Sequence, residues 1–201
     1  MPDRASPVRR VDAERNRAKI LAAARTAFAE PDVDVSMAEI SRRAGVGMAT
    51  LYRNFPGRRE LLEALYTDEV DAICAAAITL GEQRPGAKFT AWLRRFVAFS
   101  ANKRHIASEL LTHVERSNPV FDDNRARVLA AGRPLLIAAQ RADEIRGDLS
   151  LEQILDMIIA VAAIRADPTY LDPILQTTID GLQPRPQATA NERRNARRAK
   201  R

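Results

Sequence analysis

The chain has 201 residues, 46% of them hydrophobic and 29% charged, with a formal net charge of +6 at pH 7; this is the composition of a folded globular protein. Its one cysteine, Cys74, excludes a disulfide framework and a multi-cysteine metal site. The longest apolar run, residues 157–164, is far shorter than the ~20 residues of a membrane-spanning helix. Residues 1–17 lack the apolar core of a secretory signal, so we expect a cytoplasmic protein with no membrane partner.

Charge is distributed unevenly along the chain. Residues 1–60 carry 12 basic and 8 acidic side chains, residues 61–182 carry 13 and 17, and residues 183–201 carry 7 and 1. Basic ends favour a polyanionic partner for both termini. The alternative is a surface whose charge is uneven without such a partner.

The predicted elements are all helical, because hydrophobic residues recur at spacings of three and four and no hairpin signal is present. We predict a flexible basic arm over residues 1–11, and helices over residues 12–30, from residue 36 for two turns, over 48–54, and over 58–80. The fold class is therefore all-α, with an N-terminal three-helix domain followed by a C-terminal helical bundle and about nine helices in total.

The C-terminal half has clear helix boundaries. Aromatic residues recur over 89–99, and helical periodicity continues to residue 114. Residues 121–142 are predicted to be helical, with Gly132 and Pro134 interrupting or kinking the helix. A capping-box sequence at 150–153 opens a helix that ends at Asp167-Pro168, and Asp172-Pro173 opens a short last helix. Residues 183–201 are predicted to be a disordered basic tail.

Residues 36–55 contain the sequence pattern of a helix-turn-helix. Ser36 and Glu39 form a capping-box sequence, and Gly45 stands where the chain must reverse. The following helix buries Leu51 and Phe55 and leaves a set of mostly small or polar side chains outside. That outward set is Met48, Ala49, Thr50, Arg53 and Asn54, with Tyr52 at its margin.

The outward set suits contact with DNA. Free N–H groups at a helix start favour phosphate, and small side chains let the backbone approach base edges. Thr50 and Tyr52 supply hydroxyls for phosphate, and Met48 and Ala49 supply apolar contact with a thymine methyl. The remaining two, Arg53 and Asn54, reach either a base or a phosphate.

Residues 44–56, together with Arg58, Glu60, Leu61 and Leu62, resemble the DNA-binding signature of the tetracycline-repressor (TetR) family of bacterial regulators. The shared features are a Gly-Val turn, a Thr-Leu-Tyr run, a phenylalanine step and a basic residue that opens the fourth helix. The resemblance covers residues 12–66 and departs from the family pattern at Gly47, Asn54 and Gly57.

The resemblance implies a dimeric repressor. Residues 12–66 would be its DNA-binding domain, and residues 67–182 a C-terminal domain that binds a small molecule and dimerises. By position, Ser36 and Met37 would lie near the DNA backbone, and residues 48–50 would face the major groove. Tyr52 and Asn54 would contact phosphate, and Arg58 would anchor the strand.

Two sets of residues are candidates for the C-terminal functions. For the effector we name Trp92, Phe96, Phe99 and His113, with a purely structural aromatic core as the alternative. An apolar face on the last two helices needs either deep burial or a second chain, and we favour a homodimer contact. That face comprises Leu151, Ile154, Leu155, Ile158, Ile159, Ala162, Ile174, Leu175 and Ile179.

The predicted function is a dimeric repressor that binds a palindromic double-stranded DNA operator and is released by an unidentified small-molecule effector. One alternative is a sequence-nonspecific nucleic-acid-packaging protein that uses the basic arm and tail. A helical enzyme is disfavoured because the sequence offers no Ser/His/Asp arrangement, metal cluster or phosphate loop. His105 and His113 are eight residues apart, which is not the spacing of a helical metal pair, so we predict no metal, cofactor or catalytic residue.

Overall fold

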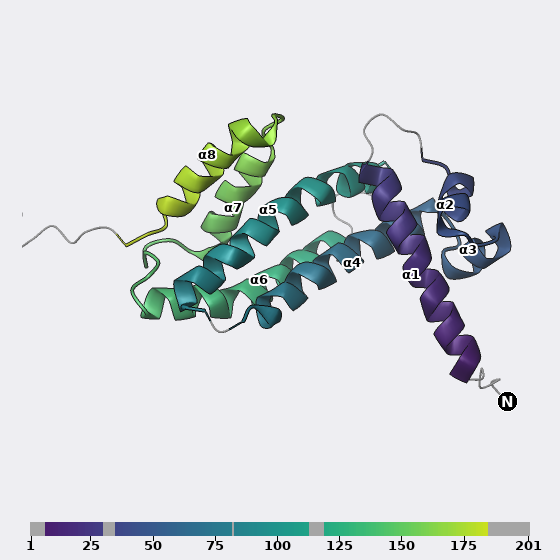
Figure 1. Cartoon of the computed structure of the whole chain (residues 1–201), viewed down its shortest axis with the longest axis horizontal. Coiled ribbons are helices and arrows are strands. Elements are labelled where there is room, and N and C mark those ends of the chain that lie inside the picture. The colour runs from purple at the N-terminus through teal and green to yellow at the C-terminus, as the bar shows by residue number, and fades with distance from the viewer. Residues whose placement is uncertain (1–6, 30–34, 82, 113–118, 185–201) are drawn as a thin grey trace, which may run out of the picture.

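The structure is a computed structural model that describes residues 7–29, 35–81, 83–112 and 119–184. These ranges contain eight α-helices and no strand, so the all-α fold class is confirmed (Figure 1). None of the helices in these ranges is long and apolar enough to cross a membrane. The predicted tail from residue 185 onward and the first six residues of the arm lie outside the described residues.

The N-terminal part contains α1 (Pro7–Ala29), α2 (Met37–Ala44) and α3 (Met48–Asn54), followed by α4 (Arg58–Thr79). Helix α1 packs against α2, α3 and α4. It begins at Pro7, so the prediction of a flexible arm is wrong for residues 7–11. Proline is well suited to the first helical position because its φ is preset and its missing N–H has no intrahelical partner there.

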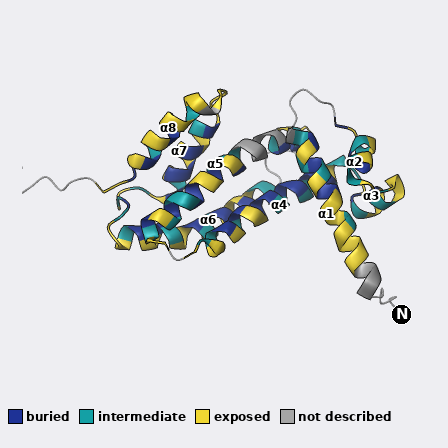
Figure 2. Cartoon of the chain, viewed as in Figure 1, coloured by how far each residue is buried: buried dark blue, intermediate teal, exposed yellow. Residues whose placement is uncertain are grey.

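The C-terminal part contains α5 (Pro85–Leu110), α6 (Pro119–Arg141), α7 (Leu151–Ala162) and α8 (Pro168–Asp180). The long helices α4, α5 and α6 pack against one another, and α7 packs on α5 and α6 (Figure 1). Helix α8 packs on α7, at the end of the molecule opposite α2 and α3. One continuous cluster of buried hydrophobic side chains runs through both parts (Figure 2).

Trp92 lies at the centre of the C-terminal core. Its side chain is fully buried, its rings stack between those of Phe89 and Phe96, and its Nε1 donates a hydrogen bond to the carbonyl of Ile73 at 3.1 Å. The indole therefore joins α5 to α4 with its polar group satisfied, as a buried tryptophan requires.

Gly132 and Pro134 were predicted to interrupt or kink helix α6; α6 is not interrupted and runs through both residues. Gly132 is buried where α6 crosses the Trp92 ring, and a Cβ built there would lie 2.7 Å from Cζ3 of the indole. Glycine is therefore needed at this position for close packing between helices and does not end the helix.

The last helix begins earlier than predicted. Asp167 is its N-cap: the carboxylate accepts hydrogen bonds from the backbone N–H groups of Thr169 at 2.8 Å and Tyr170 at 3.2 Å. The Thr169 hydroxyl contact and these N–H groups lower the pKa of Asp167. Asp172 and Pro173 lie inside α8, so the assignment of Asp172 as the N-cap was wrong. Asp167-Pro168 and Asp172-Pro173 both match the sequence pattern of a helix start. Because α7 ends at Ala162, Asp167 lies outside that helix and can act as the N-cap of α8.

We expect Gly132→Ala to lower the free energy of unfolding by about 1 to 2 kcal/mol, because the new methyl group overpacks against Trp92. At an exposed helical position the same change would stabilise the helix. A decrease in the free energy of unfolding therefore indicates close packing against Trp92. Urea unfolding followed by circular dichroism measures it. Gly147→Ala is the control, since a Cβ there meets no atom within 4 Å; equal stability of the two variants would contradict the packing argument.

Candidate nucleic-acid interface

Helix α2 begins at Ser36, whose Oγ accepts a hydrogen bond from the Glu39 N–H at 3.1 Å. The Glu39 carboxylate, predicted to complete a capping box, is bound by the guanidinium groups of Arg42 at 2.7 Å and Arg43 at 2.6 Å. Hydrogen bonds from Arg42 and Arg43 lower the pKa of Glu39 to about 2. The carboxylate is therefore ionised at neutral pH and orders the two arginines on α2.

The turn between α2 and α3 is made by Gly45, which adopts a left-handed conformation with φ 64°. Its N–H bonds to the carbonyl of Arg42, and the N–H of Val46 bonds to the carbonyl of Ser41 at 3.1 Å. The buried Ser41 hydroxyl donates to the Val46 carbonyl at 2.6 Å. The sequence analysis did not select Ser41; a lone hydroxyl on the buried face of α2 was the available signal.

Helix α3 is anchored from one side and exposed on the other. Leu51 is fully buried and Phe55 nearly so, with the Arg17 guanidinium of α1 4.6 Å from the centre of the Phe55 ring. On the outer side, Met48 is 38% exposed and Tyr52 46% exposed. The predicted division between buried and outward residues is confirmed here; Ala49 and Arg53 are exposed and Thr50 and Asn54 half-buried. At the start of α2, Ser36 is exposed and Met37 half-buried.

Two of the outward side chains fold back on the helix. Arg53 donates from Nε to the carbonyl of Ala49 at 3.2 Å and from Nη2 to Oγ1 of Thr50 at 3.1 Å. The Asn54 amide donates to the carbonyl of Thr50 at 2.8 Å. Hydrogen bonds of this kind contribute about 1 kcal/mol net, so a phosphate or base can replace them at low cost.

Arg58 is held by contacts within the chain. Its guanidinium donates to the Val35 carbonyl and to the Glu109 carboxylate near the end of α5, and it stacks 5.2 Å from the centre of the Phe28 ring. The side chain is only 23% exposed. In this structure Arg58 joins α1, α4 and α5, and its contact with a DNA strand stays a prediction. Its partner Glu109 is 51 residues away in sequence, beyond the reach of a motif comparison.

A second ion-pair cluster joins α1 to α4. Arg25 on α1 is bound to Asp68 and Glu69 on α4, and Glu69 is buried. Together with the contact between Arg58 and Phe28, this cluster attaches α1 to α4.

Of the four candidate effector residues, two line a cavity, one lies in the core and one is outside the described residues. Phe96 and Phe99 line a cavity of about 210 Å3 between α4, α5, α6 and α7. Trp92 does not line this cavity, because its ring is enclosed against Gly132; it is a core residue. His113 lies outside the described residues. The sequence analysis missed Tyr66, Phe121 and Arg125, because they come from helices other than the aromatic stripe.

Most of the predicted dimer residues belong to the core of a single chain. Leu151, Ile154, Leu155 and Ile158 are each at most 3% exposed, so the assignment of these four to an interface is wrong. Deep burial, the alternative left open by the sequence, is what the structure shows for them. A further three are also buried, namely Ala162, Leu175 and Ile179. Only Ile159, at 42%, is well exposed, and Ile174 is half-buried.

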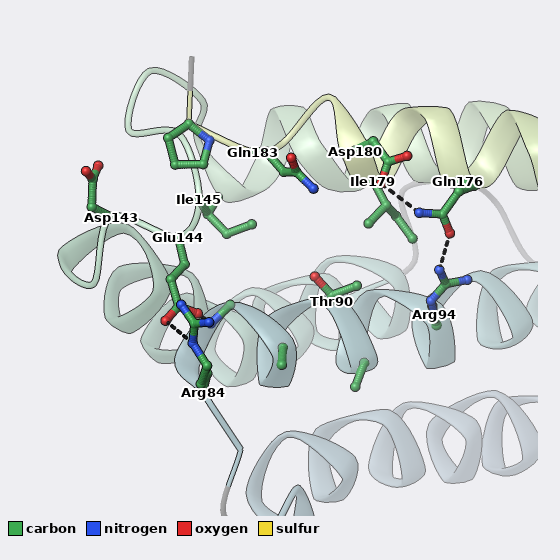
Figure 3. Close-up of a pocket in the computed structure, with 14 residues that line it drawn as sticks. Arg84, Thr90, Arg94, Asp143, Glu144, Ile145, Gln176, Ile179, Asp180 and Gln183 are labelled. Atoms are coloured by element: carbon green, nitrogen blue, oxygen red, sulfur yellow. Dashed lines mark hydrogen bonds and ion pairs between the residues drawn. The ribbon is translucent and has the colours of Figure 1, made fainter. Parts of the chain in front are cut away.

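The other cavities of the described chain show no catalytic or metal-binding arrangement. One of them is a groove of about 750 Å3 between α5 and α8 (Figure 3). Its polar residues bind one another: Arg84 pairs with Glu144 at 3.0 Å, and Arg94 contacts Gln176, whose amide donates to Asp180 at 2.7 Å. No group of three His, Cys, Asp or Glu side chains that could hold a metal ion occurs among the residues described.

Comparison with known proteins gives the family. Residues 20–65 match the sequence profile of bacterial regulatory proteins of the TetR family, and residues 84–184 match that of the C-terminal domain of SbtR-like transcriptional regulators. The chain belongs to the TetR family. The predicted resemblance is thus confirmed, and it extends over both parts of the fold.

Individual relatives are similar to this protein over most of its length. A TetR regulator of Streptomyces coelicolor is 35% identical, with 85% of this chain and 99% of that one covered and a TM-score of 0.74. A TetR regulator of Mycobacterium vanbaalenii is 32% identical, with 87% and 98% covered and a TM-score of 0.72. A helix-turn-helix-type transcriptional regulator of Mycobacterium bovis is 29% identical over 168 residues, covering 79% of this chain and 85% of that one. This TetR protein is accordingly a DNA-binding transcriptional regulator and not an enzyme.

We expect Arg58 and Glu109 to be coupled by about 1 kcal/mol in a double-mutant cycle, because their side chains are about one quarter and one third exposed. The cycle uses urea unfolding of Arg58→Gln, Glu109→Gln and the double variant. The more exposed pair of Arg59 and Glu63, 3.5 Å apart, serves as the control cycle, with a coupling near zero. Additive effects of Arg58→Gln and Glu109→Gln on the free energy of unfolding would show that the two side chains do not stabilise each other.

Proposed function

We propose that this TetR protein is a dimeric repressor that binds a palindromic operator through α3 and leaves it when a small molecule binds the C-terminal domain. The observation that carries the proposal is the outward face of α3, where Met48 and Tyr52 stand exposed above the buried Leu51 and Phe55. Such a repressor acts on the bacterial chromosome, and we therefore assign it to the cytoplasm.

In the proposed complex, α3 lies in the major groove. Met48, Ala49 and Thr50 face the bases, Tyr52 and Asn54 contact phosphate, and Arg53 is released from its contacts on the helix to reach a base or phosphate. Ser36 and Met37, at the start of the eight-residue helix α2, lie near the DNA backbone. A contact of Arg58 with the DNA strand would require its guanidinium to leave Val35 and Glu109.

The proposed dimer uses the outer side of α7 and α8. Large hydrophobic side chains are exposed there beside the small residues Ala160 and Ala163, which permit close approach of a second helix. The large ones are Met157, Ile159, Ile164 and Tyr170. A two-fold dimer presents two recognition helices to successive turns of the major groove when they are about 34–36 Å apart.

Helix α4 provides the proposed connection between ligand and DNA. Tyr66 on α4 lines the cavity of about 210 Å3, and Arg58 at the start of the same helix is tied to Val35, which directly precedes α2. A ligand that favours a different position of α4 therefore favours a different spacing of the two recognition helices. A coupling of about 1–3 kcal/mol between the two sites changes affinity by about 5- to 150-fold.

The replacement of Thr50 by Ala together with Tyr52 by Phe removes two hydroxyls that the proposal places on DNA. We expect operator binding to weaken by about tenfold or more, since each hydrogen bond contributes about 0.5–1.5 kcal/mol. The operator is recovered by selecting genomic fragments bound by the purified protein, and affinity is measured by fluorescence anisotropy. The control, Thr79→Ala with Thr90→Ala, removes two hydroxyls that lie outside α3 and outside the proposed dimer face.

The packaging alternative gives the opposite pattern. It predicts binding that hardly depends on DNA sequence and that is mostly lost when residues 183–201 are removed. The repressor proposal predicts that this truncated chain keeps its preference for the operator in competition with unrelated DNA at physiological salt.

Unchanged operator affinity in the variant with Thr50→Ala and Tyr52→Phe would refute the contact assignment, provided that helicity and oligomeric state are those of the wild type.

Ala160→Glu places a charge at the centre of the proposed dimer face. We expect the variant to be monomeric in sedimentation equilibrium with unchanged circular dichroism, because an unpaired carboxylate in an apolar interface is strongly unfavourable. Ala72→Glu, at an exposed position of α4, is the control and should leave the dimer intact. A dimeric Ala160→Glu protein would show that the interface lies elsewhere.

A further inference from the structure

The cavity of about 210 Å3 in the C-terminal part is lined by aromatic and aliphatic side chains together with two charged ones, Asp122 and Arg125. Tyr66, Phe96 and Phe99 form one wall and are each at most 6% exposed. Phe121 packs edge-on against Tyr66, with ring centres 5.4 Å apart and an interplanar angle of 84°. Aromatic walls in edge and tilted arrangements favour insertion of another flat ring.

The size of the cavity limits what can enter it. An apolar cavity of about 150 Å3 is enough to hold a benzene ring. Pockets for drug-sized ligands measure about 300–1,000 Å3. A volume of about 210 Å3 therefore fits one aromatic ring with a small substituent, and it excludes multi-ring ligands in this conformation.

Two charged groups determine which substituent fits. Asp122 and Arg125 of α6 line the same cavity, one turn of helix apart. The Arg125 guanidinium is 51% exposed, and its contact with Asp156 measures 4.0 Å, at the outer limit for an ion pair. The carboxylate only accepts hydrogen bonds and the guanidinium only donates them. A hydroxyl group does both, so one hydroxyl satisfies both partners.

We propose that this cavity binds a neutral monocyclic phenol, with the ring between the aromatic walls and the hydroxyl donating to Asp122 and accepting from Arg125. A carboxylate in the same position is attracted by Arg125 and repelled by Asp122, and an unsubstituted ring makes no hydrogen bond with either of these two exposed groups. The inference rests on the proposed function in naming this cavity as the effector site. Phenol binding to the cavity does not itself require DNA.

The experiment compares phenol, benzoate and toluene, which share one ring and differ in the attached group. Binding to the full chain without DNA is measured by isothermal titration calorimetry up to about millimolar concentration. We expect phenol to bind about tenfold more tightly than either of the other two, because a mismatched polar group costs about that factor. Benzoate binding more tightly than phenol, toluene binding equally well, or no binding of phenol would overturn the proposal.

Two matched substitutions test the roles of the charges. Asp122→Asn removes the repulsion, so benzoate affinity should rise while phenol affinity falls; Arg125→Gln should weaken both. Asp123→Asn removes the same charge from the adjacent position, which is exposed like Asp122 but does not line the cavity, and should leave the order unchanged. If Asp123→Asn alters the order as Asp122→Asn does, the effect comes from general electrostatics and the assignment is wrong.

Filling the cavity tests its position. Leu129→Phe, at a half-buried position that lines it, should abolish phenol binding, and circular dichroism establishes that the variant is folded. Should Leu129→Phe not fold, Val128→Leu adds one methylene group to the lining of the cavity and should weaken phenol binding. Retained phenol binding in a folded Leu129→Phe protein would overturn the proposed site.

Operator release is then measured separately. Phenol that binds as described without releasing the operator refutes effector release and leaves the cavity assignment intact. Operator binding without any phenol binding refutes the cavity assignment and leaves the DNA-binding proposal intact.

Discussion

Helix α4 shares its buried face between two groups of helices, and the rest of the structure depends on this sharing. Its buried residues run from Leu61 to Ala76, where they contact α1 at one end and α5 and α6 along the remainder. The result is one continuous hydrophobic core. Because such interiors are close-packed, a shift of α4 has to be matched by its neighbours. The DNA-binding helices therefore cannot move independently of the C-terminal bundle.

Ion pairs add direction to this packing. Hydrophobic contact alone is non-directional, whereas the Arg25 cluster and the bonds of Arg58 to Val35 and Glu109 require particular helix positions. Arg58 is well suited to this because its planar guanidinium also stacks on Phe28. Two arginines thus specify how α1 and the segment before α2 sit on α4 and α5.

The outward face of α3 and the C-terminal cavity differ in how they are built. The outward face of α3 belongs to one short helix, with Leu51 and Phe55 as its anchors, and its residues lie within a few positions of one another. The cavity is assembled from four helices, so its residues, such as Tyr66 and Arg125, are far apart in sequence. For this reason the sequence pattern was sufficient to find the first region, and it found only Phe96 and Phe99 of the second.

Local chemistry determined what the sequence alone could predict: the helical periodicity, the Ser36 and Ser150 caps, the left-handed Gly45 turn and the outward side of α3. Each of these depends on residues within about one or two turns, whose interactions are the same in any fold. Tertiary structure alone decided the partner of Arg58, the packing of Gly132 on Trp92 and which of two Asp-Pro pairs starts α8. It also decided that Ile154 and Ile158 face their own core instead of a second chain. The identity of an apolar or charged residue does not specify which distant residues it will contact, because burial and ion pairing depend on neighbours in space and not in sequence.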